Sequence, residues 1–99
     1  MIKLVTWEMD RTHTSTDPAE RMKHTLIMCE MVKKNIASGT LQMWGINPGA
    51  HTGFGISGAD EKEILGMVAQ YVPYVKFKVE HMLDVDEVIA TLKSAEQKT

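Results

Sequence analysis

The 99-residue sequence predicts a single α+β domain, residues 1–99, built on an antiparallel sheet. Residues 74–83 alternate between apolar and charged side chains, which is typical of a strand with one buried face. Asp17 followed by Pro18 has the chemistry of a helix N-terminus, and residues 47–50 have that of a turn between two short strands. A chain of this length has room for only one hydrophobic core.

The first half of the chain predicts a strand, a long helix and a hairpin. Residues 2–9 are rich in β-formers, and none of them breaks a strand. The helix begins after the Asp17 cap and ends at Gly39, because glycine suits the residue that follows a helix. Residues 40–47 then form a strand that pairs across the turn with residues 52–57.

The second half completes a ferredoxin-like plan. A helix begins near residues 58–60 and ends before Pro73, because proline disfavours helical geometry in the residue that precedes it. The alternating strand 74–83 follows. The resulting order, βαββαβ, predicts an antiparallel sheet with both long helices on one face. Right-handed crossovers then arrange the strands in the order fourth, first, third and second.

The C-terminal segment predicts one more helix. Asp84, with Glu87 three residues later, has the pattern of a helix cap. We expect a short helix that continues to about Lys93 and residues 94–99 that fray.

Alternation along the strands also predicts which side chains the helices cover. In the later strands we expect the helix side to carry Leu41, Met43, Phe54, Ile56, Val75, Phe77 and Val79. The opposite side then carries Gln42, Trp44, Gly53, Gly55, Tyr74, Lys76 and Lys78. Both faces of the first strand are apolar, and we assign Ile2 and Leu4 to the helix side. The opposite side of that strand consists of Lys3, Val5 and Trp7.

Charge and cysteine content exclude several classes of protein. Eleven Lys and Arg against thirteen Asp and Glu give a net charge of −2, so the chain lacks the basic character of a nucleic-acid-binding protein. No apolar run approaches the roughly 20 residues of a membrane span. The first residues have no signal-peptide pattern, and the single Cys29 excludes an internal disulfide. We therefore expect a cytoplasmic protein without a nucleic-acid or membrane partner.

Two loop histidines raise the question of a metal site. The predicted fold brings His13, before the first helix, and His51, in the hairpin turn, to the same end of the sheet. With Asp10 or Asp17 they could hold a divalent ion. No HxH, HxxE or CxxC spacing supports such a site, and exposed loop histidines are the stronger interpretation. We predict neither a metal nor a cofactor.

The sheet face opposite the helices is the candidate ligand site. Trp7 and Trp44 supply aromatic surface there, Lys76 and Lys78 supply positive charge, and His51 stands at the mouth. Glycines in the neighbouring strand leave space above the sheet. A small aromatic or anionic organic molecule suits this composition. An equally supported alternative is that the same residues form the interface of a homodimer.

Three segments of the chain resemble a known family. They are Lys3-Leu4-Val5-Thr6-Trp7, Gly53-Phe54-Gly55-Ile56 and the strand Tyr74-Val75-Lys76-Phe77-Lys78-Val79-Glu80 with Met82-Leu83-Asp84 after it. Together they resemble a family of short uncharacterised proteins in the dimeric α/β-barrel superfamily. The resemblance implies a homodimer in which two ferredoxin-like sheets pair face to face. Relatives in that superfamily include muconolactone isomerases and small cofactor-free monooxygenases.

Residues and resemblance together favour a homodimeric small-molecule-binding or sensing domain. The alternatives are a cofactor-independent monooxygenase or isomerase, and a purely structural interaction module. For an enzyme, His51 is the only plausible acid or base, because an imidazole changes its charge near neutral pH. The sequence assigns no catalytic residue.

Overall fold

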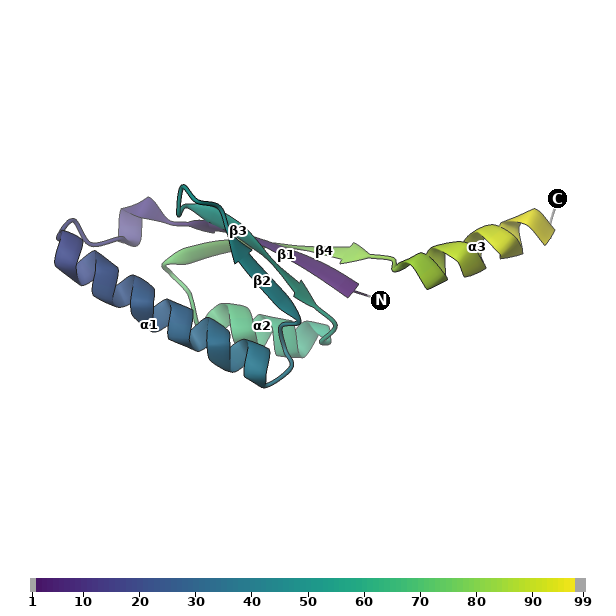
Figure 1. Ribbon diagram of the computed structural model, residues 1–99, viewed down its shortest axis with the longest axis horizontal. Helices are drawn as coiled ribbons and strands as arrows, with labels where there is room; N and C mark the ends of the chain where they lie inside the picture. The colour runs from purple at the N-terminus through teal and green to yellow at the C-terminus, as the bar shows by residue number, and fades with distance from the viewer. Residues whose placement is uncertain (1, 98–99) are drawn as a thin grey trace.

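The computed structural model describes residues 2–97 and shows an α+β fold with a four-stranded antiparallel sheet and three helices (Figure 1). The strands lie in the order β2-β3-β1-β4, and every neighbouring pair is antiparallel. This arrangement is compatible with a ferredoxin-like fold. In chain order the elements are β1 (Ile2–Met9), the short 3-10 helix η1 (Arg11–His13), α1 (Pro18–Ala37), β2 (Met43–Ile46), β3 (Thr52–Ser57), α2 (Glu61–Ala69), β4 (Val75–Met82) and α3 (Val85–Gln97).

Strands β1 and β3 have the predicted bounds, whereas β2 is shorter than predicted. The backbone N–H of Leu41 donates to the carbonyl of Asn35 near the end of α1, at 3.1 Å. Leu41 is therefore held by the helix rather than by the sheet, and β2 begins only at Met43.

Helix α3 begins at the predicted cap and ends later than predicted. The Glu87 N–H donates to Asp84 Oδ1 at 2.8 Å, and the Asp84 N–H donates back to Glu87 Oε1 at 3.3 Å. This reciprocal pair is a capping box. The expected fraying is wrong for residues 94–97, which are helical, because Ala, Glu and Gln in this stretch are good helix formers. Residues 98–99 lie outside the described part of the chain.

Helices α1 and α2 cover one face of the sheet, and α3 extends away from it as an arm (Figure 1). We call the first face the helix-covered face. The opposite face, which no described element covers, is the outer face. The arm makes the molecule long, with extents of 62 × 25 × 21 Å. Its radius of gyration is 16.9 Å, against roughly 13 Å for a compact chain of this length.

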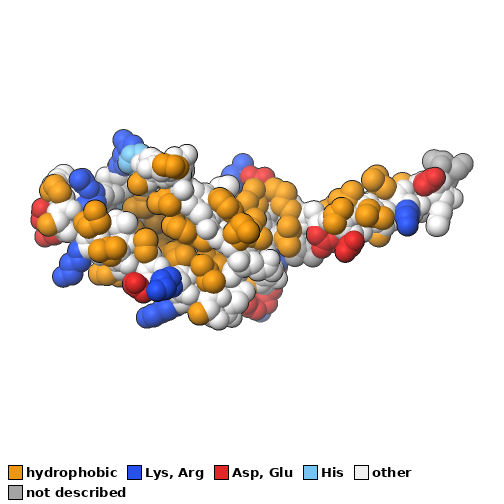
Figure 2. Space-filling model, viewed as in Figure 1, with side chains coloured by type: hydrophobic (Ala, Val, Ile, Leu, Met, Phe, Trp, Pro, Cys, Tyr) orange, Lys and Arg blue, Asp and Glu red, His pale blue; other side chains and the backbone are white. Residues whose placement is uncertain are grey.

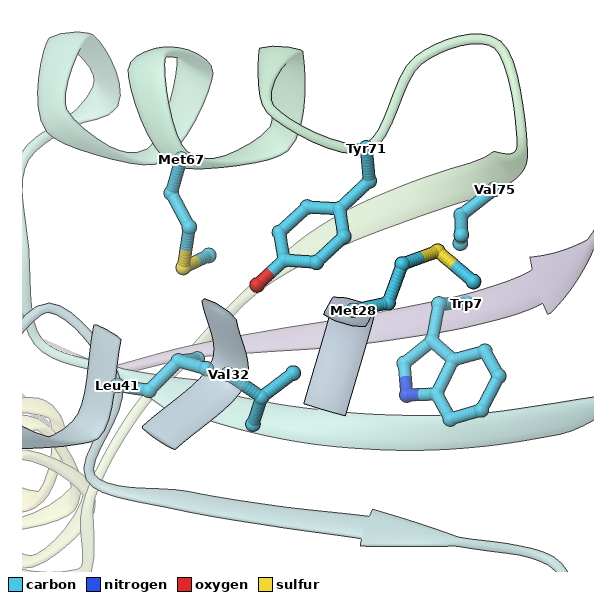
Figure 3. Close-up of a cluster of buried hydrophobic side chains, with 7 residues drawn as sticks. All are labelled: Trp7, Met28, Val32, Leu41, Met67, Tyr71 and Val75. Carbon is cyan, nitrogen blue, oxygen red and sulfur yellow. The ribbon is translucent and has the colours of Figure 1, made fainter. Parts of the chain in front are cut away.

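The core lies between the helix-covered face and the two helices. Its buried members come from α1, α2, the segments that follow them, β1 and β4: Trp7, Met28, Val32, Leu41, Met67, Tyr71 and Val75. Figure 3 shows Met67 and Tyr71 reaching from α2 and the segment after it toward the sheet, with Trp7 on β1 beyond Met28. Trp44 and Phe77 pack against this cluster.

Register decides which side chains share a face. Trp7 lies opposite Gly53 on β3 and opposite Phe77 on β4. Residues that lie opposite each other point to the same side of a sheet. The helix-covered face therefore carries Lys3, Val5, Trp7, Met9, Trp44, Ile46, Gly53, Gly55, Ser57, Val75, Phe77, Val79 and His81. The outer face carries Ile2, Leu4, Thr6, Glu8, Met43, Gly45, Thr52, Phe54, Ile56, Lys76, Lys78, Glu80 and Met82.

The predicted faces are right for β4 and wrong for β1, β2 and β3. Residues predicted on the helix side but found on the outer face are Ile2, Leu4, Met43, Phe54 and Ile56. Residues predicted on the opposite side but found under the helices are Lys3, Val5, Trp7, Trp44, Gly53 and Gly55. The two tryptophans need covering, and the helices supply the only cover within residues 2–97.

Candidate functional site

A cavity of about 780 Å³ opens between the helix-covered face and α1. Its volume lies within the range of small-molecule sites. Hydrophobic side chains gather around a hollow in the body of the molecule (Figure 2). The apolar and aromatic part of the lining consists of Val5, Trp7, Met9, Pro18, Met22, Met28, Val32, Leu41, Trp44, Ile46, Ala50, Met67, Tyr71, Val75 and Phe77.

The floor of the cavity is a pair of stacked tryptophans. The rings of Trp7 and Trp44 lie 5.6 Å apart between centroids and only 6° from parallel. Trp7 comes from β1 and Trp44 from β2, and β3 runs between those two strands. The two rings can meet above β3 because the residues of β3 that pair with them, Gly53 and Gly55, have no side chains.

Gly53 is required by this stack. A Cβ atom at that position would collide with the indole ring of Trp7 and with the carbonyl oxygen of Gly45. The backbone carbonyl cannot move aside as a flexible side chain could. The glycines of this strand were expected to leave space for a neighbour or a ligand. At Gly53 the neighbour that fills the space is Trp7.

One polar atom in the cavity wall has no partner. Trp7 is only 8% exposed, and its indole Nε1 is buried without a hydrogen-bond acceptor among the described residues. An unsatisfied buried donor costs roughly 1–3 kcal/mol. The nitrogen is also inaccessible to solvent, so it lies behind the open surface of the cavity rather than on it.

The opposite wall is held by a buried polar pair. The Asn35 side-chain amide donates to the Tyr71 hydroxyl oxygen at 2.6 Å. Burial raises the pKa of the Tyr71 hydroxyl, the Asn35 hydrogen bond lowers it in part, and the hydroxyl therefore stays protonated at neutral pH. The Tyr71 ring also packs against Phe77, with centroids 5.8 Å apart. These contacts fix the shape of the cavity next to α2.

The rim carries the charged and polar side chains, which come from η1, the loop that follows it, the first half of α1 and the hairpin turn. They are Arg11, Thr14, Ser15, Thr16, Arg21, Thr25 and His51. The Met9 N–H donates to the His51 carbonyl at 2.8 Å, so the hairpin turn is tied to the end of β1. Arg21 lies in the first turn of α1, where its N–H donates to the carbonyl of the Asp17 cap at 3.0 Å.

Asp10 orders the segment that carries Arg11. Its carboxylate accepts from the Thr12 N–H at 3.0 Å and from the Thr12 hydroxyl at 2.6 Å. These two hydrogen bonds, the hydroxyl contributing more, lower the pKa of Asp10. The Asp10 N–H donates in turn to the Tyr74 carbonyl at 2.8 Å, which anchors η1 to the start of β4.

The charges around the cavity favour an anion. Arg11 and Arg21 are both part of the lining, and no lining residue within the described chain is an Asp or a Glu. Cys29 is half-buried in the same wall. An apolar interior with guanidinium groups at its rim suits a ligand that has one apolar end and one anionic end.

The structure brings together three of the five predicted ligand residues. Trp7, Trp44 and His51 all line the cavity. Lys76 and Lys78 do not, because they lie on the outer face, and their inclusion in the same lining is corrected here. The cavity itself is on the helix-covered face rather than on the opposite one.

Three residues with polar or charged groups line the cavity but were not among the predicted site residues. Arg11, Arg21 and Tyr71 line the cavity without having been singled out. Arg11 and Arg21 are the two arginines of the sequence, and they lie on either side of the loop that carries His13. Tyr71 had no comparable signal, since it lies between α2 and β4 in a segment without periodicity.

The histidine and carboxylate groups of the same loops do not cluster. His13 Nδ1 lies 3.3 Å from Asp10 Oδ2, and that contact is a local one within η1 and its cap. Across residues 2–97 no group of three or more His, Cys, Asp or Glu side chains has a geometry that could hold a metal ion. Within the same residues, every helix is too short or too polar to cross a membrane.

No protein-family model matches the chain, and no curated protein has a significantly similar sequence.

Proposed function

We propose that this protein is a homodimeric small-molecule-binding or sensing domain of the cytoplasm, whose ligand is a small aromatic organic anion. One observation carries the proposal. A cavity of about 780 Å³ has two stacked tryptophans in its floor and two arginines, but no described carboxylate, in its lining. The small size of the chain and the uncovered outer face support association into a dimer.

Each part of the cavity selects one feature of the ligand. A flat ring fits the apolar interior and can lie against the indole of Trp44 or Trp7. A carboxylate or sulfonate at the rim would pair with Arg11 or Arg21.

The chemistry of the lining favours binding over turnover. Its titratable groups are Arg11, Arg21, Cys29, His51 and Tyr71. The Tyr71 hydroxyl is engaged by Asn35, and no carboxylate is placed to accept a proton. An isomerase or a cofactor-free monooxygenase would depend on His51 alone, which stands at the rim rather than beside the apolar interior.

Tryptophan fluorescence tests the proposal directly, because both tryptophans of the chain line the cavity. We expect 2-naphthoate to quench their emission saturably and to bind more tightly than 2-naphthamide. The acid and the amide have similar size and shape, so the difference reports the charge alone. Absence of saturable quenching by both compounds would overturn the proposal.

Paired arginine and lysine variants locate the charge. The double variant Arg11→Met, Arg21→Met should weaken naphthoate by about tenfold or more, since a hydrogen bond to a charged group contributes roughly 1.5–3 kcal/mol. Naphthamide should bind nearly as before. The matched control, Lys76→Met with Lys78→Met, changes the outer face by the same chemistry and should leave both affinities unchanged. Equal weakening of acid and amide would show that the arginines do not recognise the anion.

A further inference from the structure

Helix α3 is amphipathic, and residues 2–97 do not bury its apolar side. Its apolar residues recur at helical spacing: Val85, Val88, Ile89 and Leu92. None of its residues is buried, and Val85 and Leu92 are 70% and 64% exposed. Figure 2 shows hydrophobic side chains along the arm, clear of the body. A helix of 13 residues with an unburied apolar stripe is marginal in water by itself.

The outer face of the sheet is the second unpartnered apolar surface. It carries Ile2, Leu4, Met43, Phe54, Ile56 and Met82. Met43 is 56% exposed, and no described element covers the others. Ile2 lies opposite Met82 at the end of the sheet from which the arm departs. The apolar part of the outer face is therefore next to the root of the arm.

The exposed area matches what a stable dimer would bury. The chain exposes 7091 Å², whereas a compact monomer of 11.1 kDa would expose roughly 5,700 Å². The difference is about 1,400 Å² for each chain, or about 2,800 Å² for two copies. Obligate homodimers bury about 2,000–5,000 Å² in total.

We propose that α3 is an exchanged arm, which packs its apolar stripe on the outer face of a second copy while the partner's arm does the same in return. This inference rests on the homodimer of the proposed function and is independent of the ligand. Two residues, Leu83 and Asp84, join β4 to α3, and the helix runs away from its own sheet. The capping box fixes where the helix starts, directly after these two residues.

Dimensions agree with this exchange. Thirteen helical residues span about 20 Å. A strand of eight residues spans about 27 Å, and four strands span about 14 Å across. One helix therefore fits on one sheet. When two copies each place their arm on the other's outer face, the exchange closes with two-fold symmetry and leaves no arm or face free to extend a filament.

Light scattering on the full chain tests the exchange. We expect the unchanged protein to have a mass of about 22 kDa at micromolar concentration, twice the 11.1 kDa of one chain. Ile89→Glu on the arm and Phe54→Glu on the outer face should each reduce the mass to that of a monomer. Ser94→Glu, on the polar side of α3, is the matched control and should remain dimeric. If Phe54→Glu fails to fold by circular dichroism, Met43→Glu is the more exposed substitute on the same face.

Mixing the two monomeric variants distinguishes a dimer held by arm-on-sheet contacts from dimers held by other contacts. An Ile89→Glu chain retains its outer face and a Phe54→Glu chain retains its arm, so the mixture should regain the dimer mass through one intact contact. A dimeric Ile89→Glu protein would overturn the exchange and indicate direct pairing of sheets. A monomeric Ile89→Glu protein with a dimeric outer-face variant would overturn it in favour of pairing between arms.

The ligand assay keeps this inference distinct from the proposed cavity. Saturable quenching by 2-naphthoate in a monomeric arm variant would show that the cavity works without the exchange. A monomeric unchanged protein would overturn the exchange and the homodimer together, whatever the outcome of the quenching experiment.

Discussion

Both faces of the sheet carry apolar side chains, and the cavity described above lies on the helix-covered one. On the helix-covered face, Trp7 and Trp44 stack across a strand whose glycines leave room for them. On the outer face, Phe54 of the same strand covers Gly45 of its neighbour and remains 38% exposed. The glycines of β3 therefore decide on which face large rings can gather, because they leave room there for rings from the neighbouring strands. A ring-filled face then needs the helices as a lid.

The difference between the two faces predicts that the largest loss of stability follows substitution of Trp7. Replacing this buried ring by Ala should lower the free energy of unfolding by about 3–5 kcal/mol, because the stack with Trp44 is lost and a cavity remains. Glu8→Ala, at the exposed neighbouring position of β1, should change it by less than about 0.5 kcal/mol. Urea denaturation measures both. Similar midpoints for the two variants would contradict the assignment of faces in β1.

A second effect, of intermediate size, is expected at the glycines. Gly53→Ala should destabilise the protein by about 1–3 kcal/mol, because the added Cβ meets Trp7 and a fixed carbonyl. Gly66→Ala in α2 has open space around the new atom and should stabilise the helix by up to about 1 kcal/mol. Thermal denaturation of the two variants should therefore shift in opposite directions. A shift in the same direction would show that β3 tolerates a side chain on the helix-covered face.

The smallest effect concerns the buried hydroxyl that closes the cavity. Tyr71→Phe leaves the Asn35 amide without its acceptor and should cost about 1 kcal/mol at neutral pH. The folded pKa of Tyr71 is raised above the unfolded value of 10.0, so the folded state holds this proton more tightly. Its contribution is fully present below pH 10 and is lost as the pH rises through the folded pKa.

The pH dependence of unfolding checks that sign. The stability of the unchanged protein should fall above pH 10, and Tyr71→Phe should remove part of that fall. The exposed Tyr74 offers the matched variant, Tyr74→Phe, which removes a tyrosine hydroxyl outside the core. Parallel curves for the unchanged protein and Tyr71→Phe would show that the hydroxyl is not desolvated.

The sequence predicted several residues of the candidate site but not the face of the sheet on which the site lies. Trp7, Trp44 and His51 were predicted to share a site, and the cavity lining contains all three. Lys76 and Lys78 were added to them because the faces of β1 and β2 were chosen wrongly, whereas the alternation within β4 was interpreted correctly. Tyr71 and the two arginines come from irregular or cap-proximal segments, where no period indicates a direction.

Local structure along the chain could be predicted from the sequence. The Asp17 cap, the turn at residues 47–50 and the capping box of Asp84 and Glu87 depend on atoms within a few residues, so short-range chemistry was enough to place them. Only the tertiary structure decided which face of β1 is buried. Leu4 and Val5 are both apolar, and the choice depends on the space that glycines of another strand leave above the sheet. The departure of α3 from the body was likewise a tertiary outcome, because an apolar stripe specifies that a helix needs a partner but not which surface supplies it.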